Sequence, residues 1–286
     1  MTRTWTDPGH TEALSGLYFK AARKRKITGS VLPAGGLRCT LAVDARRLDA
    51  YCKLCHFGDE HHLPATFPHV MAFALQMQLL TSREFPFPLL GLVHLHNSIR
   101  VLRPLGGVSQ LQFSVWVENL QPHEKGATFD LVTEAADGLG LIWSETSRML
   151  CRGVTLEGDA VEIDAPEALP LSELTRWYAD SDIGRRYAKV CGDYNPIHLS
   201  AVSAKLFGFP QAIAHGMWSK AMAVAALRGH LPLSGYEIAV GFQKPVRLPS
   251  EVVLECSDVG AQGQLRLRGH GELVHMLGSW RPIAKS

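Results

Sequence analysis

Hydrophobic residues recur at two different spacings along the chain, and each spacing predicts one kind of element. In residues 67–80 and 213–227, apolar side chains are three or four positions apart, which predicts two helices of three or four turns. Each is followed by segments in which apolar and polar residues alternate, which predicts half-buried strands. These segments are 109–120, 127–136 and 140–150 in the first half, and 251–259, 263–273 and 275–280 in the second.

The two helix-and-strand units also resemble each other in sequence. YCKLC at 51–55 returns as YAKVC at 187–191, and His69 of the first predicted helix has a counterpart in His215 of the second. Self-similarity of this kind is typical of a repeated structural unit. The second copy is longer between these landmarks, and its additional length contains the segment GDYNPIH, which the first copy lacks.

A helix followed by antiparallel strands must bury its apolar face against one face of the sheet. Two such units can pair through their sheet edges. We therefore predict an α+β tandem fold, in which two long central helices are wrapped by one continuous antiparallel sheet. The expected units are residues 1–155 and 171–286, joined by an acidic, proline-bearing linker at 156–170.

Composition is that of a globular protein, with 46% hydrophobic and 20% charged residues. The net charge of +2 gives no support for nucleic-acid binding. One basic run, KAARKRK at 20–26, is either a solvated helix face or a surface that attracts an anionic group such as a nucleotide phosphate. The chain shows neither a secretory signal nor an apolar stretch long enough for a membrane span, so we expect a cytoplasmic protein with reduced cysteines.

In the segment CKLCHFGDEHH at 52–62, Cys52, Cys55 and His56 have the spacing of a c-type haem motif, and the addition of His61 and His62 suggests a zinc site. Haem attachment of that type requires an export route, and a structural zinc site usually has two separated ligand pairs. Cys52 is also replaced by alanine in the second copy of the repeat. We therefore expect buried thiols followed by a polar loop, and no metal.

Candidate chemistry lies in VCGDYNPIH at 190–198, where an acid, an amide and an imidazole fall within six positions. Asn195-Pro196 by itself is a turn signal, and a helix is expected from Ser200 to Gly208. The step AHGM at 214–217 adds a possible oxyanion donor. Backbone N–H groups in the first turn of a helix lack helical partners, and Gly216 has no side chain to keep a substrate away from its amide.

These residues resemble a known family. The segment 187–217 is similar to the hydratase motif of MaoC-like, R-specific 2-enoyl-CoA hydratases and 3-hydroxyacyl-thioester dehydratases, which have the hot-dog fold, although Cys191 stands where serine is more usual. The two-copy length resembles the double hot-dog members, in which one half has lost the motif. The resemblance implies that Asp193 and His198 activate water, that Asn195 positions the site, and that the Gly216 amide binds the thioester oxygen.

The expected substrate-binding residues are Tyr187, Ile213, His215, Met217, Lys244 and Arg247. Among them, His215 is expected to be mainly structural, because His69 echoes it in the half without the motif. Lys244 and Arg247, placed on the strand after the second helix, are candidates for the phosphates of coenzyme A. Displacement of the first helix, at residues 67–80, is expected to open room for an acyl tail.

The implied substrate is an acyl-CoA or acyl-carrier-protein thioester, with no cofactor other than the coenzyme A of the substrate. A homodimer of tandem chains is possible. Two other interpretations stay open. The chain could be a dehydratase acting on carrier-protein or polyketide thioesters, or a non-catalytic subunit that binds acyl thioesters. A hot-dog thioesterase is disfavoured because the hydratase motif is present in full.

Overall fold

The computed structural model describes residues 3–58, 62–159 and 169–284. The described strands form one sheet of eleven, in the order β1-β2-β4-β5-β6-β3-β8-β11-β10-β9-β7. Strands of the first half are β1 (Trp5–Thr6), β2 (Gly36–Ala42), β3 (Val93–Val101), β4 (Gln110–His123), β5 (Gly126–Asp137) and β6 (Gly140–Arg152). Strands of the second half are β7 (Ser172–Ala179), β8 (Tyr236–Phe242), β9 (Ser250–Cys256), β10 (Gly263–Arg268) and β11 (Val274–Pro282).

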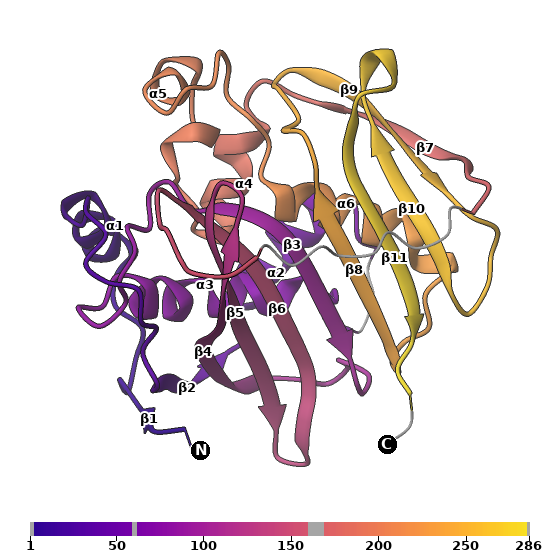
Figure 1. Cartoon of the computed structure of the whole chain (residues 1–286). Coiled ribbons are helices and arrows are strands. Elements are labelled where there is room, and N and C mark those ends of the chain that lie inside the picture. Colours follow the sequence, from indigo (N-terminus) through magenta and orange to yellow (C-terminus); the bar gives the residue numbers. More distant parts are fainter. Residues whose placement is uncertain (1–2, 59–61, 160–168, 285–286) are drawn as a thin grey trace.

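The two halves join through β3 and β8, which pair antiparallel with Ile99 opposite Ile238. Both isoleucines are fully buried. Except for the short parallel pair β1–β2, the strand pairs are antiparallel. Figure 1 shows the resulting sheet running across the molecule without a break. The predicted tandem hot-dog architecture with one continuous sheet is therefore confirmed.

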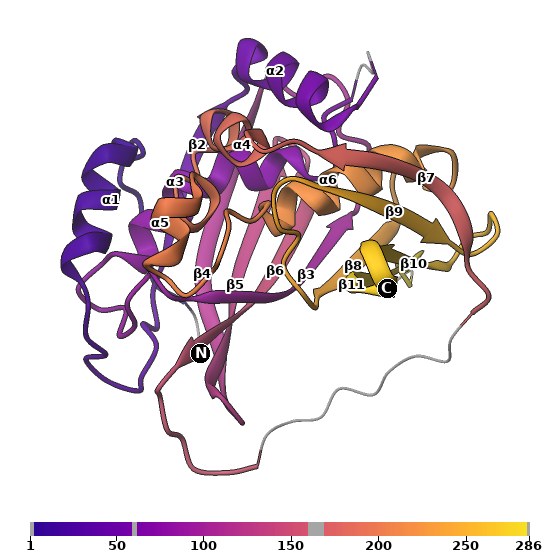
Figure 2. The ribbon, with the colours of Figure 1, turned by 90° about the horizontal axis from the view of Figure 1, so that it is seen from above.

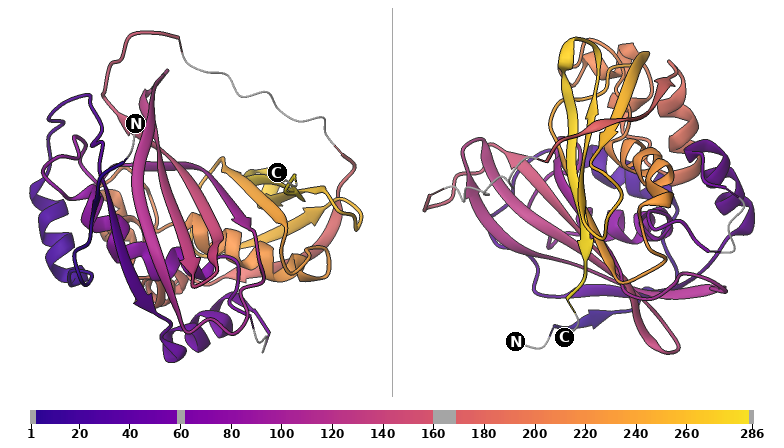
Figure 3. Two further views of the ribbon diagram at one scale, coloured as in Figure 1. Left: turned by 90° about the horizontal axis from the view of Figure 1, so that it is seen from below. Right: turned by 90° about the vertical axis from the view of Figure 1, so that its right-hand side faces the viewer.

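The helices gather on one side of this sheet (Figure 2). They are α1 (Leu14–Arg23), α2 (Ala45–Cys55), α3 (Phe67–Leu80), α4 (Ile183–Cys191), α5 (Ala201–Lys205) and α6 (Gly216–Ala226), with three-residue 3₁₀ turns at Pro196–His198, Leu227–Gly229 and His270–Glu272. The apolar helices α3 and α6 are the central pair, and the sheet curves around them (Figure 3). Among the described residues, no helix combines the length and the apolar character that a bilayer span requires.

The repeat seen in the sequence has a structural counterpart. YCKLC lies at the end of α2 and YAKVC at the end of α4. The rings of Tyr51 and Tyr187 lie 6.2 Å apart, so the repeated helices pack against each other where the two halves meet.

Several predicted boundaries need correction. The first central helix coincides with 67–80, but the second begins at Gly216, because residues 212–214 instead pair in extended form with 246–248. The strand predicted over 263–273 ends at Arg268, where a 3₁₀ turn follows. Ser200 caps α5 as expected, but the helix ends at Lys205. Most of the predicted linker, residues 160–168, lies outside the described residues.

The basic run at 20–26 straddles the end of α1, and several of its side chains are engaged within the chain. Lys20 pairs with Glu12 at 2.6 Å, Arg23 lies over the exposed ring of Phe19, and Lys24 reaches backbone carbonyls of the loop after α3. Burial lowers the pKa of Lys24. The run is therefore only partly a solvated face.

The cysteine segment at 52–62 belongs to α2 and the residues after it. Cys55 is buried, Cys52 is half-buried, and His56 ends the helix with a left-handed backbone. Across the described part of the chain, no cluster of three potential metal ligands includes them. His61, which was considered with them, lies outside the described residues. All six cysteines are free thiols.

Candidate active site

Two glycines allow the chain to fold into the turn that carries Asp193 and His198. Gly192 ends α4 in the left-handed region (φ 88°), a conformation that residues with a Cβ rarely adopt. Gly184 lies in the first turn of α4, where a Cβ would collide with the carbonyl oxygen of His198. The absence of side chains at these two positions therefore places the 193–198 turn directly on α4.

Asn195 organises this turn internally. Its backbone N–H donates to Asp193 Oδ1 over 3.1 Å, and its own side-chain oxygen accepts from the Ile197 N–H over 3.4 Å. The second bond caps the 3₁₀ turn at Pro196–His198. Asn195 thus connects Asp193 to the 3₁₀ turn that contains His198, and its positioning role in catalysis stays a prediction.

The Asp193 carboxylate is partly exposed within the site, with a side-chain exposed fraction of 30%. Burial acts to raise its pKa, but the neighbouring imidazoles of His215 and His198 and the hydrogen bonds from the Asn195 amide and Tyr18 outweigh that effect. The pKa of Asp193 therefore lies below its ordinary value, and the group is ionised at neutral pH.

His198 is held in one tautomer by the backbone. Its Nδ1–H donates to the carbonyl oxygen of Ile213 over 2.8 Å, which leaves Nε2 with a free lone pair. Burial lowers the pKa of His198, although the negative charge of Asp193 partly opposes this shift. The imidazole is therefore neutral at physiological pH and can accept a proton.

His215 stacks on His198, with ring centroids 3.7 Å apart. Its Nε2–H donates to the backbone carbonyl of Asp193 over 2.9 Å, and its other ring nitrogen is buried without a partner among the described residues. Burial lowers the pKa of His215 to about 3. It thus contacts the ring of His198 and the backbone of Asp193, and its Nε2 lies 3.8 Å from Asp193 Oδ2; its structural role stays a prediction.

Gly216 begins α6 immediately after His215. No other described residue accepts a hydrogen bond from its N–H. A Cβ at this position would lie 2.9 Å from the ring of Phe242, so a side chain would crowd the wall beside the amide. A free amide at a helix N-terminus is suited to stabilise developing negative charge on an oxygen atom.

Asp193, His198 and Gly216 all line one cavity of about 850 Å³. Its walls come from both halves of the chain. The second half contributes the 193–198 turn, the start of α6 and the residues after β8, and the first half contributes α3, β6 and the loop between α3 and β3. The cavity therefore extends from the candidate catalytic residues into the space beside the first central helix.

The remaining predicted substrate-binding residues are placed differently from one another. Tyr187, Ile213 and Met217 line the cavity, with the Tyr187 ring 5.0 Å from that of His215. Lys244 is exposed and lines the cavity after the end of β8, whereas Arg247 is exposed and is not part of the lining. Neither lies on β8, which ends at Phe242. The phosphate-binding role of both stays a prediction.

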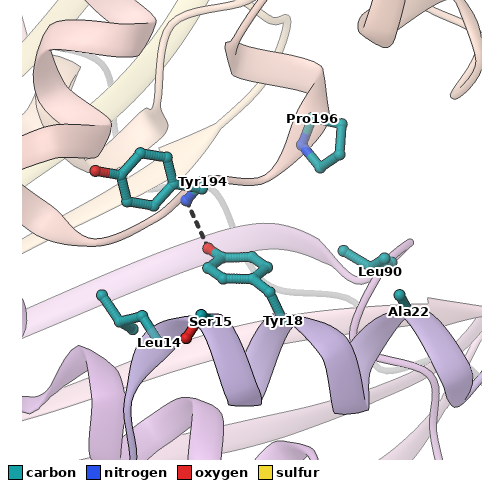
Figure 4. Close-up of a pocket in the computed structure, with 7 residues that line it drawn as sticks. All are labelled: Leu14, Ser15, Tyr18, Ala22, Leu90, Tyr194 and Pro196. Atoms are coloured by element: carbon teal, nitrogen blue, oxygen red, sulfur yellow. Dashed lines mark hydrogen bonds between the residues drawn. The ribbon is translucent and has the colours of Figure 1, made fainter.

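Tyr18 of α1 is a site residue that sequence reasoning missed. Its hydroxyl lies 3.2 Å from both Asp193 Oδ1 and the carbonyl oxygen of Gly192, and it accepts a hydrogen bond from the Tyr194 N–H (Figure 4). Burial, strengthened by the charge of Asp193, raises the pKa of Tyr18, so the hydroxyl stays protonated as a donor. A helix of the first half thus contacts the candidate catalytic carboxylate of the second.

Tyr18 also lines a second hollow, of about 470 Å³, between α1 and the turn at Tyr194 and Pro196. Figure 4 shows its ring between the helix and that turn. Tyr18 lines both this hollow and the cavity that contains Asp193.

Three side chains of the site, those of Asp193, His198 and His215, form the candidate metal-ligand cluster among the described residues. Ligand atoms of Asp193, His198 and His215 lie within 4.8 Å of one another. However, His198 Nδ1 and His215 Nε2 are already bonded to backbone carbonyls, and His215 Nδ1 is buried. A metal ion bound through His215 Nε2 would displace the bond that holds His215 to the Asp193 backbone.

Comparisons with known proteins agree with this geometry. The model of the MaoC-like domain matches residues 163–273. The chain is 33% identical to 3-hydroxyacyl-thioester dehydratase X of Mycobacterium tuberculosis over 80% of its own length and 81% of the relative's. It is 28% identical to the peroxisomal enoyl-CoA hydratase 2 of Arabidopsis thaliana, over 48% of each chain.

Solved structures give the same result. HtdX of Mycobacterium tuberculosis superposes with a TM-score of 0.75 at 29% identity, covering 86% of this chain and all (100%) of that one. A MaoC-like dehydratase from Phytophthora capsici superposes with a TM-score of 0.71 over 88% of this chain and 96% of that one, where 20% identity shows a shared fold. The chain therefore belongs to the MaoC-like family of hot-dog dehydratases and hydratases.

Proposed function

We propose that the protein catalyses the reversible addition of water to trans-2-enoyl thioesters, giving (R)-3-hydroxyacyl thioesters. The observation that carries this proposal is the convergence of Asp193, His198 and the unpaired Gly216 amide on one cavity. The relatives named as a 3-hydroxyacyl-thioester dehydratase and an enoyl-CoA hydratase support the reaction type. The R configuration rests on the likeness of residues 187–217 to the R-specific hydratase motif.

Water needs a base to attack the β-carbon of an enoyl thioester. In the proposed mechanism, the Asp193 carboxylate and the free Nε2 of His198 hold one water molecule between them and accept its proton as the carbon–oxygen bond forms. The proton then passes to the α-carbon. A positioned base of this kind typically contributes about 10²–10⁴-fold to the rate. In the reverse direction the same groups remove the α-proton and release water.

The electrons of the double bond move onto the thioester oxygen during the attack. The Gly216 N–H, reinforced by the positive end of the α6 dipole, donates to that oxygen in the proposed complex. One fixed donor at a developing oxyanion is worth roughly 3–4 kcal/mol of transition-state stabilisation. Because Gly216 has no side chain, the thioester can approach the amide closely.

The acyl tail is proposed to lie in the part of the cavity beside α3. Phe73, Met77 and Leu80 of that helix line the cavity, together with Leu131 of β5 and Met149 of β6. The first half, which lacks the catalytic motif, would then supply the wall for the tail. This agrees with the expectation that the space beside residues 67–80 takes an acyl chain.

The carrier of the acyl group is a separate question. One matched relative is a mitochondrial 3-hydroxyacyl-[acyl-carrier-protein] dehydratase of Arabidopsis thaliana, 32% identical over 28% of this chain. Coenzyme A and carrier proteins present the same pantetheine arm, so either could deliver a thioester to Gly216. A purely binding subunit is the weaker alternative, because it would have no need for Asp193, His198 and the free amide together.

The test is hydration by the purified protein, followed as the loss of enoyl absorbance. Crotonyl-CoA and trans-2-decenoyl-CoA are compared with the corresponding carrier-protein thioesters, and the configuration of the product is determined by chiral chromatography. We expect turnover with (R)-3-hydroxyacyl products. A folded protein that hydrates neither carrier's thioesters would contradict the proposal and favour the binding-subunit alternative.

A further inference from the structure

Part of the wall beside α3 is polar, although the tail of a plain acyl chain is not. We define the polar strip as His69 and Gln76 of α3, His94 of β3 and Ser147 of β6, all of which line the cavity. The apolar side chains of Phe73, Met77 and Met149 line the same space. A wall that only had to accept a hydrocarbon chain would not need four hydrogen-bonding side chains.

A β-bulge brings His94 into this strip. In the pairing of β3 with β6, Asn97 lies opposite Ser147 and His94 lies opposite Met149, with the register shift between His94 and His96. Side chains of regular strands alternate between the two faces, so without the extra residue His94 would point away from Asn97. With it, His94, Asn97, Ser147 and Met149 share the inner face. Bulges commonly re-aim side chains beside functional sites.

Behind the strip lies a satisfied hydrogen-bond network centred on Glu145. Its fully buried carboxylate accepts from His69 Nδ1 at 2.9 Å, Asn97 Nδ2 at 2.7 Å and Gln76 Nε2 at 3.3 Å. Burial acts to raise the pKa of Glu145, but His69 and the hydrogen bonds from His69 and Asn97 outweigh it and place the pKa below its ordinary value. The buried Nζ of Lys220 donates in turn to three oxygens, two of Asn97 and one of Ile238.

The cavity side of the strip is not satisfied. His69 bonds to Glu145 through Nδ1, which leaves its Nε2 with no partner among the described residues. The side chain of His94 forms no hydrogen bond to the described residues, and its Nε2 is buried without a partner. An unpaired buried polar atom typically costs about 1–3 kcal/mol, so each one calls for an explanation. Here the unpaired atoms belong to two residues, His69 and His94, that line the cavity proposed for the acyl chain.

The charges around the strip select the kind of group that fits. Burial lowers the pKa of His94 to about 3, so this ring is neutral at physiological pH. The buried carboxylate of Glu145 lies behind His69 and would repel a second carboxylate. A hydroxyl group is uncharged and can both donate and accept, so it can bond to His69 Nε2 and at the same time to His94 or to the Ser147 hydroxyl. The strip therefore matches a neutral oxygen.

We propose that the polar strip binds a hydroxyl group on the acyl chain, beyond the reacting carbons, and that the protein prefers thioesters of such oxygenated chains. The inference rests on the proposed function, because it assumes that the acyl tail lies beside α3. His94 supplies selectivity and takes no part in the chemistry at Asp193 and His198. Its ring is 5.0 Å from that of Phe242, the residue that faces Gly216, so the strip begins near the thioester end of the tail.

The test uses saturated pantetheine thioesters, which bind without reacting and do not depend on the carrier. Decanoyl pantetheine is compared by titration calorimetry with derivatives that carry one hydroxyl group at successive carbons beyond C3. We expect one hydroxyl position to lower the Kd by about tenfold relative to the plain chain, the scale of one or two net hydrogen bonds. His94→Leu should abolish this preference and leave plain-chain affinity unchanged or improved.

Two further variants sharpen the comparison. Ser147→Ala should reduce the preference, whereas Met149→Leu, a nearly isosteric change on the same wall, should keep it. If no hydroxylated chain binds more tightly than the plain one, or if His94→Leu leaves the preference intact, the inference is wrong. Failure of the proposed function would appear separately, as a lack of turnover of trans-2-decenoyl pantetheine by a folded protein.

Discussion

The N-termini of the two central helices differ in what they offer to a ligand. At the start of α6, Gly216 presents an N–H that no other described residue accepts. At the start of α3, the N–H of Phe67 is bonded to the carbonyl of Pro64 over 2.8 Å, and Pro68 has no N–H. The two equivalent helices therefore differ. Among the described residues, the first N–H of α6 has no acceptor, whereas neither of the first two residues of α3 has an N–H available for a ligand.

The histidines that correspond to each other in the two halves also have different surroundings. His215 precedes α6 and stacks on His198 beside Asp193. His69, its counterpart in the repeat, lies inside α3 and pairs with Glu145 in a buried network. One copy retains an acid, an imidazole and a free amide around a cavity, and we propose that the other has become the wall for the acyl tail. Such a difference between the two halves accounts for a cavity that residues of both halves line.

The largest expected effect concerns the proposed water-binding pair. Asp193→Asn and His198→Ala should each lower kcat by about 10²–10⁴-fold, because each removes a group that holds or deprotonates water. Asp180→Asn is the matched control, since Asp180 forms an exposed ion pair with Arg186. Steady-state hydration of crotonyl-CoA measures the effect, and circular dichroism checks the fold. Full activity in either site variant would place the chemistry elsewhere.

The second effect concerns the free amide of α6. Gly216→Ala places a Cβ 2.9 Å from the Phe242 ring, which must displace either the ring or the helix start. We expect kcat to fall by about 10²-fold, the scale of losing one oxyanion donor. Gly16→Ala in α1 is the control, because a Cβ there meets nothing within 4 Å. A folded Gly216→Ala protein with normal kcat would show that this amide does not bind the thioester oxygen.

A smaller effect is expected at Tyr18, which links the first half to the reactive carboxylate. Tyr18→Phe removes the hydroxyl that lies 3.2 Å from Asp193 Oδ1, so the carboxylate loses one restraint on its orientation. We expect kcat to fall by about tenfold with little change in KM or in the melting temperature. Tyr178→Phe, at an exposed tyrosine, serves as the control. Parallel losses of kcat and stability would indicate a merely structural role.

The smallest effect is the position of the acid limb in the pH profile of the wild type. The proposed active form has ionised Asp193 and neutral His198, and burial places the pKa of His198 below its ordinary value of 6.5. Activity should therefore be unchanged as the pH falls from 8 to 6.5 and should decline only below that, as His198 takes up a proton. A limb above pH 6.5 in kcat/KM for crotonyl-CoA would argue against a neutral, buried imidazole.

Much of this arrangement could be predicted from the sequence because its determinants are local. The 3.6-residue spacing at 67–80 defined α3, and alternation defined β4, β5 and β6 to within a few residues. The repeat of Tyr51 as Tyr187 predicted two units, and the segment from Asp193 to His198 carries its own turn chemistry in Asn195 and Pro196.

The features that could not be predicted depend on contacts between distant parts of the chain. Tyr18 reaches Asp193 across 175 positions of sequence, and nothing around Tyr18 marks it as a site residue. Ile213 continues the apolar spacing of α6, but pairing with the segment at Arg247 keeps it extended. The inward turn of His94 depends on a bulge that arises only from the pairing with β6. Spacing along the sequence does not contain this information.

The most direct test of the account is a crystal structure of the Asp193→Asn variant with trans-2-decenoyl-CoA, or with the corresponding carrier-protein thioester if coenzyme A is not accepted. We expect the thioester oxygen within about 3 Å of the Gly216 nitrogen. The β-carbon should face Asn at position 193 and His198, and the tail should lie beside Phe73 and Met77. A thioester bound at the start of α3, or a tail directed away from that helix, would contradict the proposed division of labour between the two halves.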